Sequence, residues 1–352
     1  MLVVRIGAMG DVLHAMPAVA ALRERHPDWR IGWVVEPRWR TLLQAVPGSA
    51  PRGPAMPLVD DVYLAATRDW KKRPVSRATL GDIAFLRRSL RSERFDLCVD
   101  MQGSVRSAVI GRMAGAKRFI GPEEPREGPA RWLYGGRVGM GSAHVIEQGC
   151  ELLGGAIGET LPPAPVALPV DETAEALCET LLRKLGIDGE PFVVVAPTAG
   201  WGAKQWPAER FGVVATELSG QGFRVLVNAS SADDAVAAAV VHESGGQAVA
   251  VSGELGQLIA LTRRSGLVIA GDTGPLHLAA ALERPVVALF GPTDPARNGP
   301  FGTKARVLRH GTERRDHRRL AEPEAGLLEI TVDEVVAASL ELLGGVGPDE
   351  VR

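Results

Sequence analysis

The chain has 352 residues, about twice the length of a typical single domain, so two domains are expected. Hydrophobic residues make up 45% of the chain and the formal net charge is −2, which supports two buried cores and argues against a nucleic-acid partner. The chain has three widely spaced cysteines, Cys98, Cys150 and Cys178, which argue against a disulfide framework and a cysteine zinc site and suit a reducing cytosol.

The sequence contains no run of about 18 uncharged apolar residues, so no membrane span is expected. The opening MLVVRIGAMGDV enters a strand-like run at once and lacks a signal-peptide pattern. We therefore expect a cytoplasmic protein, with peripheral contact at the cytoplasmic face of the inner membrane left open.

Short apolar runs alternate with helical patterns through the first half of the chain. Strands are predicted over Leu2–Ile6, Ile31–Val35, Val62–Leu64, Leu97–Asp100 and Arg118–Ile120. Helices are predicted near Asp11–Arg25, Arg38–Val46, Leu80–Arg94 and Val105–Ala114. Fully apolar strands separated by helices indicate a parallel sheet covered on both faces.

The stretch Gly154–Val170 is rich in Gly and Pro and is not expected to form a long regular element. It predicts a linker at 158–171, between an N-terminal domain at 1–157 and a C-terminal domain at 172–352.

The same alternation resumes in the second half. Strands are predicted over Phe192–Ala196, Phe223–Val227, Ala248–Val251, Leu267–Ala270 and Val286–Phe290. Helices are predicted near Ala208–Ser219, Ala232–His242, Leu255–Arg264 and Pro275–Leu282, with a closing helix at Val332–Leu343. The expected fold is α/β, with two Rossmann-like doubly wound parallel sheets and a ligand cleft bordered by the carboxyl ends of their strands.

The first segment that could carry chemistry is Arg5–Asp11, where the first strand ends in RIGAMGD. Its glycines allow close approach of a ligand to the backbone. Because the spacing is GxxG, the dinucleotide fingerprint GxGxxG is not met. Asp11 has two interpretations: a helix N-cap, which the local pattern favours, or a general base.

The fullest signal is Gly271–His277, which directly follows a predicted strand. Gly274 permits a tight turn and Pro275 suits the first turn of a helix, so a helix N-terminus should be available to a diphosphate. His277 could lie near the same ligand or be a buried histidine satisfied by a neighbour.

A third segment, Pro197–Pro207, also lies between a strand and a helix. Its small residues could cradle phosphate with backbone amides, and Lys204 could supply a compact cation. A lone loop lysine is more often solvated, but this one is flanked by small residues and two tryptophans.

The segment Arg68–Arg94 holds nine basic and three acidic residues. For Arg87–Arg94, the solvated face of a helix is one interpretation, and a patch for an anionic acceptor or an anionic membrane surface is the other. Residues 68–77, around Trp70, are the better candidates for acceptor contact.

Several other chemistries are disfavoured by the motifs. The seven histidines show no HxxxH or His–Cys spacing, and no DxD pair stands at a strand end, which argues against a metal-dependent sugar transferase. GxSxG is absent, which argues against a hydrolase.

Six motifs stand in order along the chain: Met9–Pro17, Val34–Glu36, Asp100–Gly103, Lys204–Pro207, Asp272–His277 and Phe290–Pro295. With these motifs the chain resembles the ADP-heptose lipopolysaccharide heptosyltransferases, glycosyltransferase family 9, which have the GT-B fold. The resemblance runs from about Met1 to about Arg297, and its opening is most similar to the heptosyltransferase I subgroup.

The resemblance implies roles that the local patterns leave open. It implies that Asp11 is the catalytic base and that Lys204 and the neighbouring amides hold the leaving diphosphate. The donor site it implies consists of Thr198, Ala199, Gly200, Asp233, Asp272, Thr273, Gly274 and His277. The acceptor site we expect consists of Gly10, Arg68, Lys71, Gln102 and Arg126.

The expected reaction is a metal-independent inverting transfer of heptose from ADP-heptose to a Kdo–lipid A type acceptor in the lipopolysaccharide inner core. ADP-heptose is the donor substrate, so no separate cofactor is expected. The expected partners are the nucleotide sugar and a lipid-linked anionic glycan. The alternatives are a nucleotide-sugar epimerase of the same architecture and a catalytically inactive nucleotide-sugar-binding protein.

Overall fold

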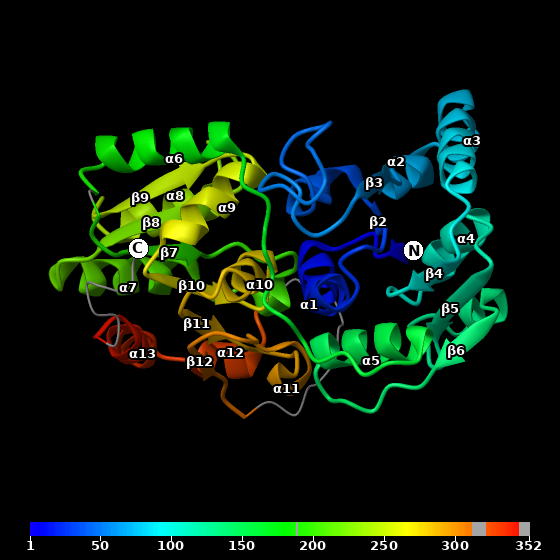
Figure 1. The fold of residues 1–352 in the computed structure, drawn as a ribbon. Helices are drawn as coiled ribbons and strands as arrows, with labels where there is room; N and C mark the ends of the chain where they lie inside the picture. Colours follow the sequence, from blue (N-terminus) through cyan, green and yellow to red (C-terminus); the bar gives the residue numbers. More distant parts are fainter. Residues whose placement is uncertain (188, 312–321, 345–352) are drawn as a thin grey trace. The chain divides into compact units, whose positions relative to one another are not determined.

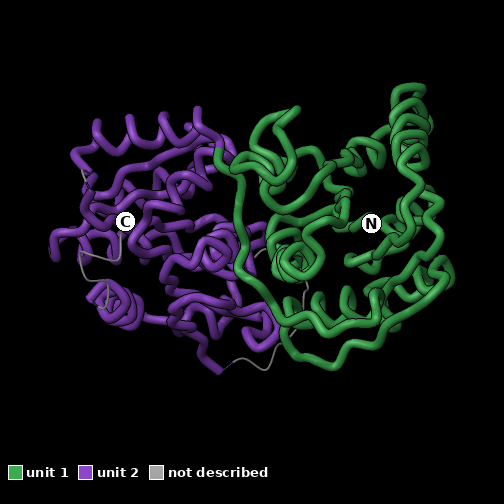
Figure 2. The backbone as a smooth tube through the Cα atoms, in the orientation of Figure 1, with its two compact units in different colours: residues 1–170 green, residues 171–352 purple. Residues whose placement is uncertain are grey.

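The computed structural model describes residues 1–187, 189–311 and 322–344. Two compact units make up the chain, Met1–Val170 and Asp171–Arg352 (Figure 2). Residues 345–352 of the predicted C-terminal domain lie outside the described residues.

The first unit is built on a sheet of six parallel strands in the order β3-β2-β1-β4-β5-β6 (Figure 1). The strands are β1 (Leu2–Val4), β2 (Gly32–Val35), β3 (Asp61–Leu64), β4 (Leu97–Asp100), β5 (Arg118–Pro122) and β6 (Gly136–Val138). This order places β1 beside β4 at the point where the winding direction reverses.

The helices of the first unit follow the strands in chain order. They are α1 (Met9–Arg25), α2 (Thr67–Lys72), α3 (Arg77–Ser92), α4 (Val105–Met113) and α5 (Val145–Ile157), with 3-10 helices η1 (Pro37–Leu42) and η2 (Gly128–Leu133). The helix predicted at Arg38–Val46 is therefore only the short η1, which begins at Pro37 and ends before the turn at Val46.

The described part of the second unit repeats the same winding, with parallel strands in the order β9-β8-β7-β10-β11-β12. The strands are β7 (Phe192–Ala196), β8 (Arg224–Ala229), β9 (Ala248–Ser252), β10 (Leu267–Gly271), β11 (Val286–Leu289) and β12 (Ala305–Leu308). Here β7 lies beside β10 at the reversal point, as β1 lies beside β4 in the first unit.

Helices of the second unit pack on both faces of its sheet. They are α6 (Glu172–Lys184), α7 (Ala208–Gly220), α8 (Ala235–Glu243), α9 (Leu255–Arg264), α10 (Gly274–Ala281), α11 (Pro295–Asn298), α12 (Ala325–Glu329) and α13 (Val332–Gly344), with the 3-10 helix η3 (Gly202–Lys204). Val193 and Val195 belong to a core shared with α7, α8 and α13, whereas Phe192 and Val194 belong to a core shared with α6, α9 and α10. Alternate residues of β7 thus serve opposite faces, as a buried parallel strand requires.

The predicted fold class, two Rossmann-like doubly wound parallel sheets, is confirmed. The structure differs from the prediction around the expected linker. Gly154 and Gly155 continue α5 to Ile157, and residues 158–170 belong to the first unit. The amide of Ala164 donates to Pro17 O, and that of Val170 donates to Pro54 O, so this segment is tied to the first unit by its own backbone.

Within the described ranges, no helix is both long and apolar enough to cross a bilayer.

Candidate functional site

Asp11 lies in the first turn of α1, directly after the central strand β1. The N-cap of α1 is Ala8, so the N-cap position predicted for Asp11 is wrong. The helix begins earlier than expected, and Asp11 is its third residue. Asp11 Oδ2 accepts a hydrogen bond from the Ala8 amide at 2.9 Å, which satisfies an N-terminal donor of the helix from within the first turn.

Arg5 holds Asp11 from the end of β1. Its guanidinium pairs with Asp11 Oδ1 at 3.0 Å and donates from Nε to the Asp11 carbonyl at 3.0 Å. It also donates from Nη1 to the carbonyl of Met101, which follows β4. The Asp11 carboxylate remains part-exposed. Arg5 therefore couples the base candidate to both central strands.

A buried carboxylate organises the loop after β4. Asp100 accepts hydrogen bonds from the amides of Gln102 and Gly103 and from the hydroxyls of Ser107 and Tyr134. Complete burial raises its pKa, and these four donors partly offset that shift. Asp100 is thus a structural group that sets the path of the loop.

Two residues expected at the acceptor site meet at this loop. Gln102 Oε1 accepts from the Ile6 amide at 2.7 Å and so joins the loops after β1 and β4. Gly103 has a φ of +69°, and a Cβ there would lie 3.0 Å from the Arg126 amide, so the Arg126 backbone passes directly over the loop. Gln102 and the Arg126 backbone therefore both lie at the loop after β4, which Gln102 ties to the loop after β1.

A second cluster lies at the ends of β2 and β3. The buried Glu36 carboxylate accepts from the Thr67 hydroxyl at 2.8 Å and from the Arg68 amide at 3.1 Å. Arg106 donates to Thr67 Oγ1 at 2.9 Å. Burial and the Arg68 charge lower the pKa of Arg38, which places Arg38 near Arg68.

The sequence interpretation assigned no role to Glu36, Thr67, Arg38 or Arg106, although Glu36 belonged to a recognised motif. Of the remaining predicted acceptor residues, Gly10 lies beside Asp11 in α1, and Lys71 is exposed on α2, the helix that carries Arg68.

In the second unit, Lys204 and His277 converge on Asp272. Lys204 Nζ pairs with Asp272 Oδ2 and lies 3.4 Å from the Asp272 carbonyl, and His277 Nε2 lies 3.1 Å from Asp272 Oδ1. Burial alone would raise the pKa of Asp272, but His277 and Lys204 hold it well below its ordinary value. The three side chains form a compact, nearly buried cluster of charged and polar groups.

This cluster stands at the start of α10. Thr273 is the N-cap, but its own side chain does not cap the helix, because the Thr273 hydroxyl donates instead to the Gly271 carbonyl at 3.2 Å. The positive end of the helix dipole is therefore left for an anion beside the Lys204 ammonium. His277 also satisfies the buried-histidine interpretation, because Asp272 is its partner.

The loops after β7 and β11 line the same edge of the second sheet. A Cβ on Gly271 would lie 3.0 Å from the Lys204 carbonyl, and one on Gly291 would lie 3.3 Å from that of Ala203. The hydroxyls of Thr198 and Thr293 are buried and have no hydrogen-bond partner among the described residues. Thr293 was missed from the sequence, where it stands in the motif Phe290–Pro295.

Three predicted donor residues remain without a contact that assigns their role. Ala199 and Gly200 lie in the loop that carries Thr198. Asp233 is exposed after β8, and its neighbour Asp234 is the buried acid that caps α8 and accepts from Ser230. Donor contact by Asp233 stays a prediction.

Taken separately, each unit gathers its polar groups beside its central strands, at the carboxyl ends where ligands bind doubly wound sheets. The first unit offers a held carboxylate, and the second offers a lysine and an uncapped helix N-terminus.

Comparison with known proteins agrees with these features. A family model described as glycosyltransferase family 9 (heptosyltransferase) matches residues 83–326, more than half of the chain. The chain is 26% identical over 318 residues to lipopolysaccharide heptosyltransferase 1 of Escherichia coli, which covers 88% of this chain and 92% of that protein.

Two solved structures share the fold. Escherichia coli heptosyltransferase WaaC with ADP has a TM-score of 0.77 at 24% identity, covering 97% of this chain and 99% of that chain. The same enzyme with ADP-2-deoxy-2-fluoro heptose has a TM-score of 0.75 at 24% identity, covering 97% and 98%. The resemblance inferred from the sequence is confirmed, and the chain belongs to glycosyltransferase family 9, the heptosyltransferase family.

Proposed function

We propose that the protein is an inverting heptosyltransferase that moves heptose from ADP-heptose to a Kdo–lipid A type acceptor of the lipopolysaccharide inner core. Family membership supports the reaction class. The description of a relative as lipopolysaccharide heptosyltransferase 1 supports the acceptor, and a solved relative described with an ADP-heptose analogue supports the donor.

The observation that carries this proposal is the Lys204–Asp272–His277 cluster at the start of α10. An ammonium group has three N–H donors, and Asp272 engages two of those on Lys204. The third donor and the uncapped amides of α10 are suited to a diphosphate. Because these groups are fixed before the reaction, they can stabilise the charge that grows on the leaving ADP.

Asp11 is the proposed base. Its oxygens already accept from Arg5 and Ala8, but each carboxylate oxygen has two lone pairs, so the part-exposed carboxylate can accept one more donor. As the acceptor oxygen attacks the anomeric carbon, Asp11 takes the hydroxyl proton. The bond from that carbon to the phosphate oxygen breaks on the opposite face, and ADP departs with the electron pair.

The acceptor side of the proposal uses Arg68, Arg126, Lys71, Gln102 and Gly10. Arginines can pair with the carboxylates of Kdo in a bidentate manner. We propose that neither a metal ion nor a separate cofactor takes part, because Lys204 and the α10 amides supply the charge stabilisation. We also propose that the enzyme acts at the cytoplasmic face of the inner membrane, because the proposed acceptor is lipid-linked.

Turnover of ADP-heptose with and without an acyl-free Kdo–lipid A acceptor tests this function, with the anomeric configuration of the product determined by NMR. We expect acceptor-dependent ADP release and an inverted product. Asp11→Asn should lower kcat by ~10²–10⁴-fold while leaving ADP affinity unchanged, because in this proposal the base meets the acceptor hydroxyl and the second unit holds the nucleotide.

Other outcomes would identify the alternatives. Conversion of the donor without an acceptor would indicate an epimerase, and tight donor binding without turnover would indicate an inactive binding protein. If the Asp11→Asn variant transferred heptose at the wild-type rate, Asp11 would not be the catalytic base.

A further inference from the structure

Helix α3 of the first unit presents an apolar surface that the proposed chemistry does not use. Thr79, Leu86 and Leu90 lie on the buried face of the helix. Leu80 and Phe85 lie outside that face and are 57% and 68% exposed, and Val75, just before the helix, is 85% exposed. Large apolar side chains exposed this far in one short segment indicate contact with something outside the chain.

Arginines accompany these apolar residues on the same helix. Arg77, Arg87 and Arg88 are exposed, and none of them forms an ion pair or side-chain hydrogen bond with another described residue. At 100° per residue, Arg77 and Arg88 lie on the outward side of α3, between the positions of Leu80 and Phe85. Asp82 is the one acidic residue within the helix. The outward side of α3 is therefore both cationic and apolar.

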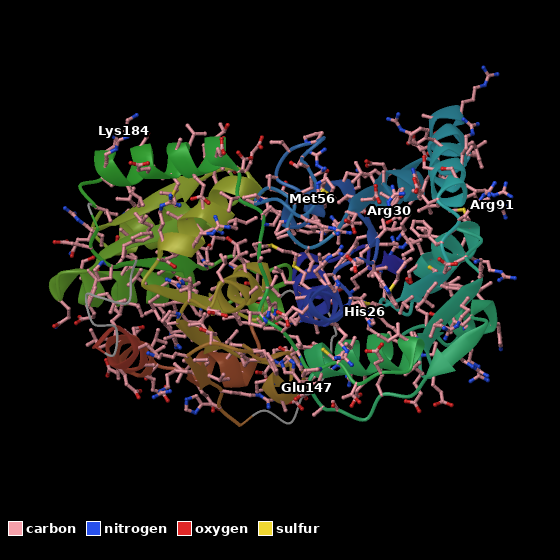
Figure 3. All side chains as sticks on the ribbon, viewed as in Figure 1. His26, Arg30, Met56, Arg91, Glu147 and Lys184 are labelled. Carbon is pink, nitrogen blue, oxygen red and sulfur yellow. The ribbon has the colours of Figure 1, made fainter. Side chains whose placement is uncertain are left out.

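One further exposed aromatic residue lies two elements away from α3. Helix α4 packs against α3, and η2 packs against α4. Figure 1 shows α3 and α4 adjacent in the first unit, and Figure 3 shows Arg91 at the end of α3. Trp132 in η2 is 76% exposed. Tryptophan favours the membrane–water interface because its ring is apolar and its N–H is polar.

We infer that the outward side of α3, with Val75 before it, is a docking surface for an anionic lipid membrane. The apolar side chains would enter the headgroup region while the arginines meet lipid phosphates. The inference rests on the proposed function, because a lipid-linked acceptor requires the enzyme to work at a bilayer. Helix α2, which carries the acceptor candidates Arg68 and Lys71, directly precedes this segment in the chain.

Co-sedimentation of the full chain with vesicles tests the surface. We expect binding to vesicles of phosphatidylethanolamine and phosphatidylglycerol, and little binding to phosphatidylcholine alone. The double variant Leu80→Ser/Phe85→Ser should weaken binding by at least about tenfold. Each Arg→Gln change at Arg77, Arg87 and Arg88 should weaken it by about fivefold at low salt.

Leu177→Ser on α6 is the matched control, because Leu177 is 50% exposed in the other unit. It should bind like the wild type. Equal vesicle binding by the α3 variants and the wild type would overturn the inference. The inference would also be overturned if analytical ultracentrifugation showed that the wild type is a dimer and the Leu80→Ser/Phe85→Ser variant a monomer. The surface would then join copies of the chain.

Transfer to an acyl-free acceptor separates this inference from the proposed function. The Leu80→Ser/Phe85→Ser variant should retain wild-type kcat/KM with that acceptor and lose rate only with acceptor embedded in vesicles. If the wild type transfers no heptose yet binds vesicles through α3, the proposed function fails and the docking surface stands. If all variants transfer heptose equally fast to acceptor embedded in vesicles, the docking surface is wrong and the proposed function stands.

Discussion

At the scale of single residues, both units hold a carboxylate beside a cation where a central strand ends. Arg5 fixes Asp11 through its carboxylate and its backbone carbonyl, and Lys204 fixes Asp272. The difference is exposure: Asp11 is part-exposed, whereas Asp272 is nearly buried and has His277 as a second partner. Asp11 is therefore suited to meet a substrate, and Asp272 to position other groups.

Replacement of Arg5 tests whether it positions the base. Arg5→Met should lower kcat by about 10²-fold and leave KM for the donor unchanged, because a base displaced by about 1 Å still allows the nucleotide to bind. Steady-state kinetics with an acyl-free acceptor provide both constants.

Two further variants make this result specific to Arg5. Arg5→Lys should recover part of the rate, because one ammonium can replace the ion pair but not the fork of donors. Arg30→Met removes a surface arginine paired with Asp61 and should keep wild-type kcat. Equal loss of kcat in Arg5→Lys and Arg5→Met would indicate a general structural defect instead.

The Asp272 cluster makes a pH-dependent contribution to stability. The pKa of Asp272 is held below its ordinary value of 3.8, so this contribution is fully present above that value and is lost as pH falls through the lower folded pKa. Asp272→Asn leaves Lys204 without its buried partner and should lower the free energy of unfolding at pH 7 by about 3 kcal/mol.

Urea denaturation of both proteins between pH 7 and pH 3 measures this effect. The difference between wild type and Asp272→Asn should be constant above about pH 5 and should narrow below pH 4. A difference that widened on acidification would contradict the assigned direction of the pKa shift.

At the scale of elements, α5 shows why the glycines at the start of the Gly- and Pro-rich stretch Gly154–Val170 do not end a helix. Gly154 reads as a helix breaker, but it lies inside α5, where a Cβ would lie 2.5 Å from the Glu159 carbonyl oxygen. Glycine is therefore required there by the close return of the chain, with Gly158 at a φ of +81° completing the turn.

Gly154→Ala should therefore destabilise the protein, although alanine is the better helix former by about 1 kcal/mol. The overlap with a backbone atom should outweigh that gain and lower the free energy of unfolding by about 1–3 kcal/mol. Gly81→Ala in α3 is the matched control, because nothing lies within 4 Å of its Cβ position, and it should stabilise slightly. Thermal denaturation shows whether each variant is more or less stable than the wild type. A Gly154→Ala variant that is more stable than the wild type would contradict the packing of α5.

Two buried strands were predicted residue for residue, and two of the edge strands were missed. Leu97–Asp100 and Phe192–Ala196 match β4 and β7 residue for residue, because strands buried on both faces are continuous apolar runs. The edge strands β6 and β12 were missed, since their exposed side chains break that pattern. Helix α6 was also missed, although Asp171 is an N-cap that accepts from Thr173 and Ala174.

At the scale of the whole molecule, the proposed chemistry predicts activity without a divalent cation. Lys204 and the α10 amides are the proposed partners of the leaving diphosphate, so EDTA should leave the transfer rate unchanged, and added Mg²⁺ should not raise it. Donor turnover in EDTA-treated, buffer-exchanged protein measures this directly. Loss of rate in EDTA that Mg²⁺ restores would contradict the proposal.

The sequence by itself determined the winding of both sheets and the segments that carry chemistry. Apolar runs, glycine-rich strand ends and helix starts are local patterns, and they placed Asp11, Lys204 and Asp272 at the carboxyl ends of strands. Only the tertiary structure decided which of these residues are partners. Arg5 reaches Met101 across 96 residues, and Lys204 reaches Asp272 across 68, because the sheet order pairs β1 with β4 and β7 with β10. Such contacts depend on strand order, a non-local property that no local pattern contains.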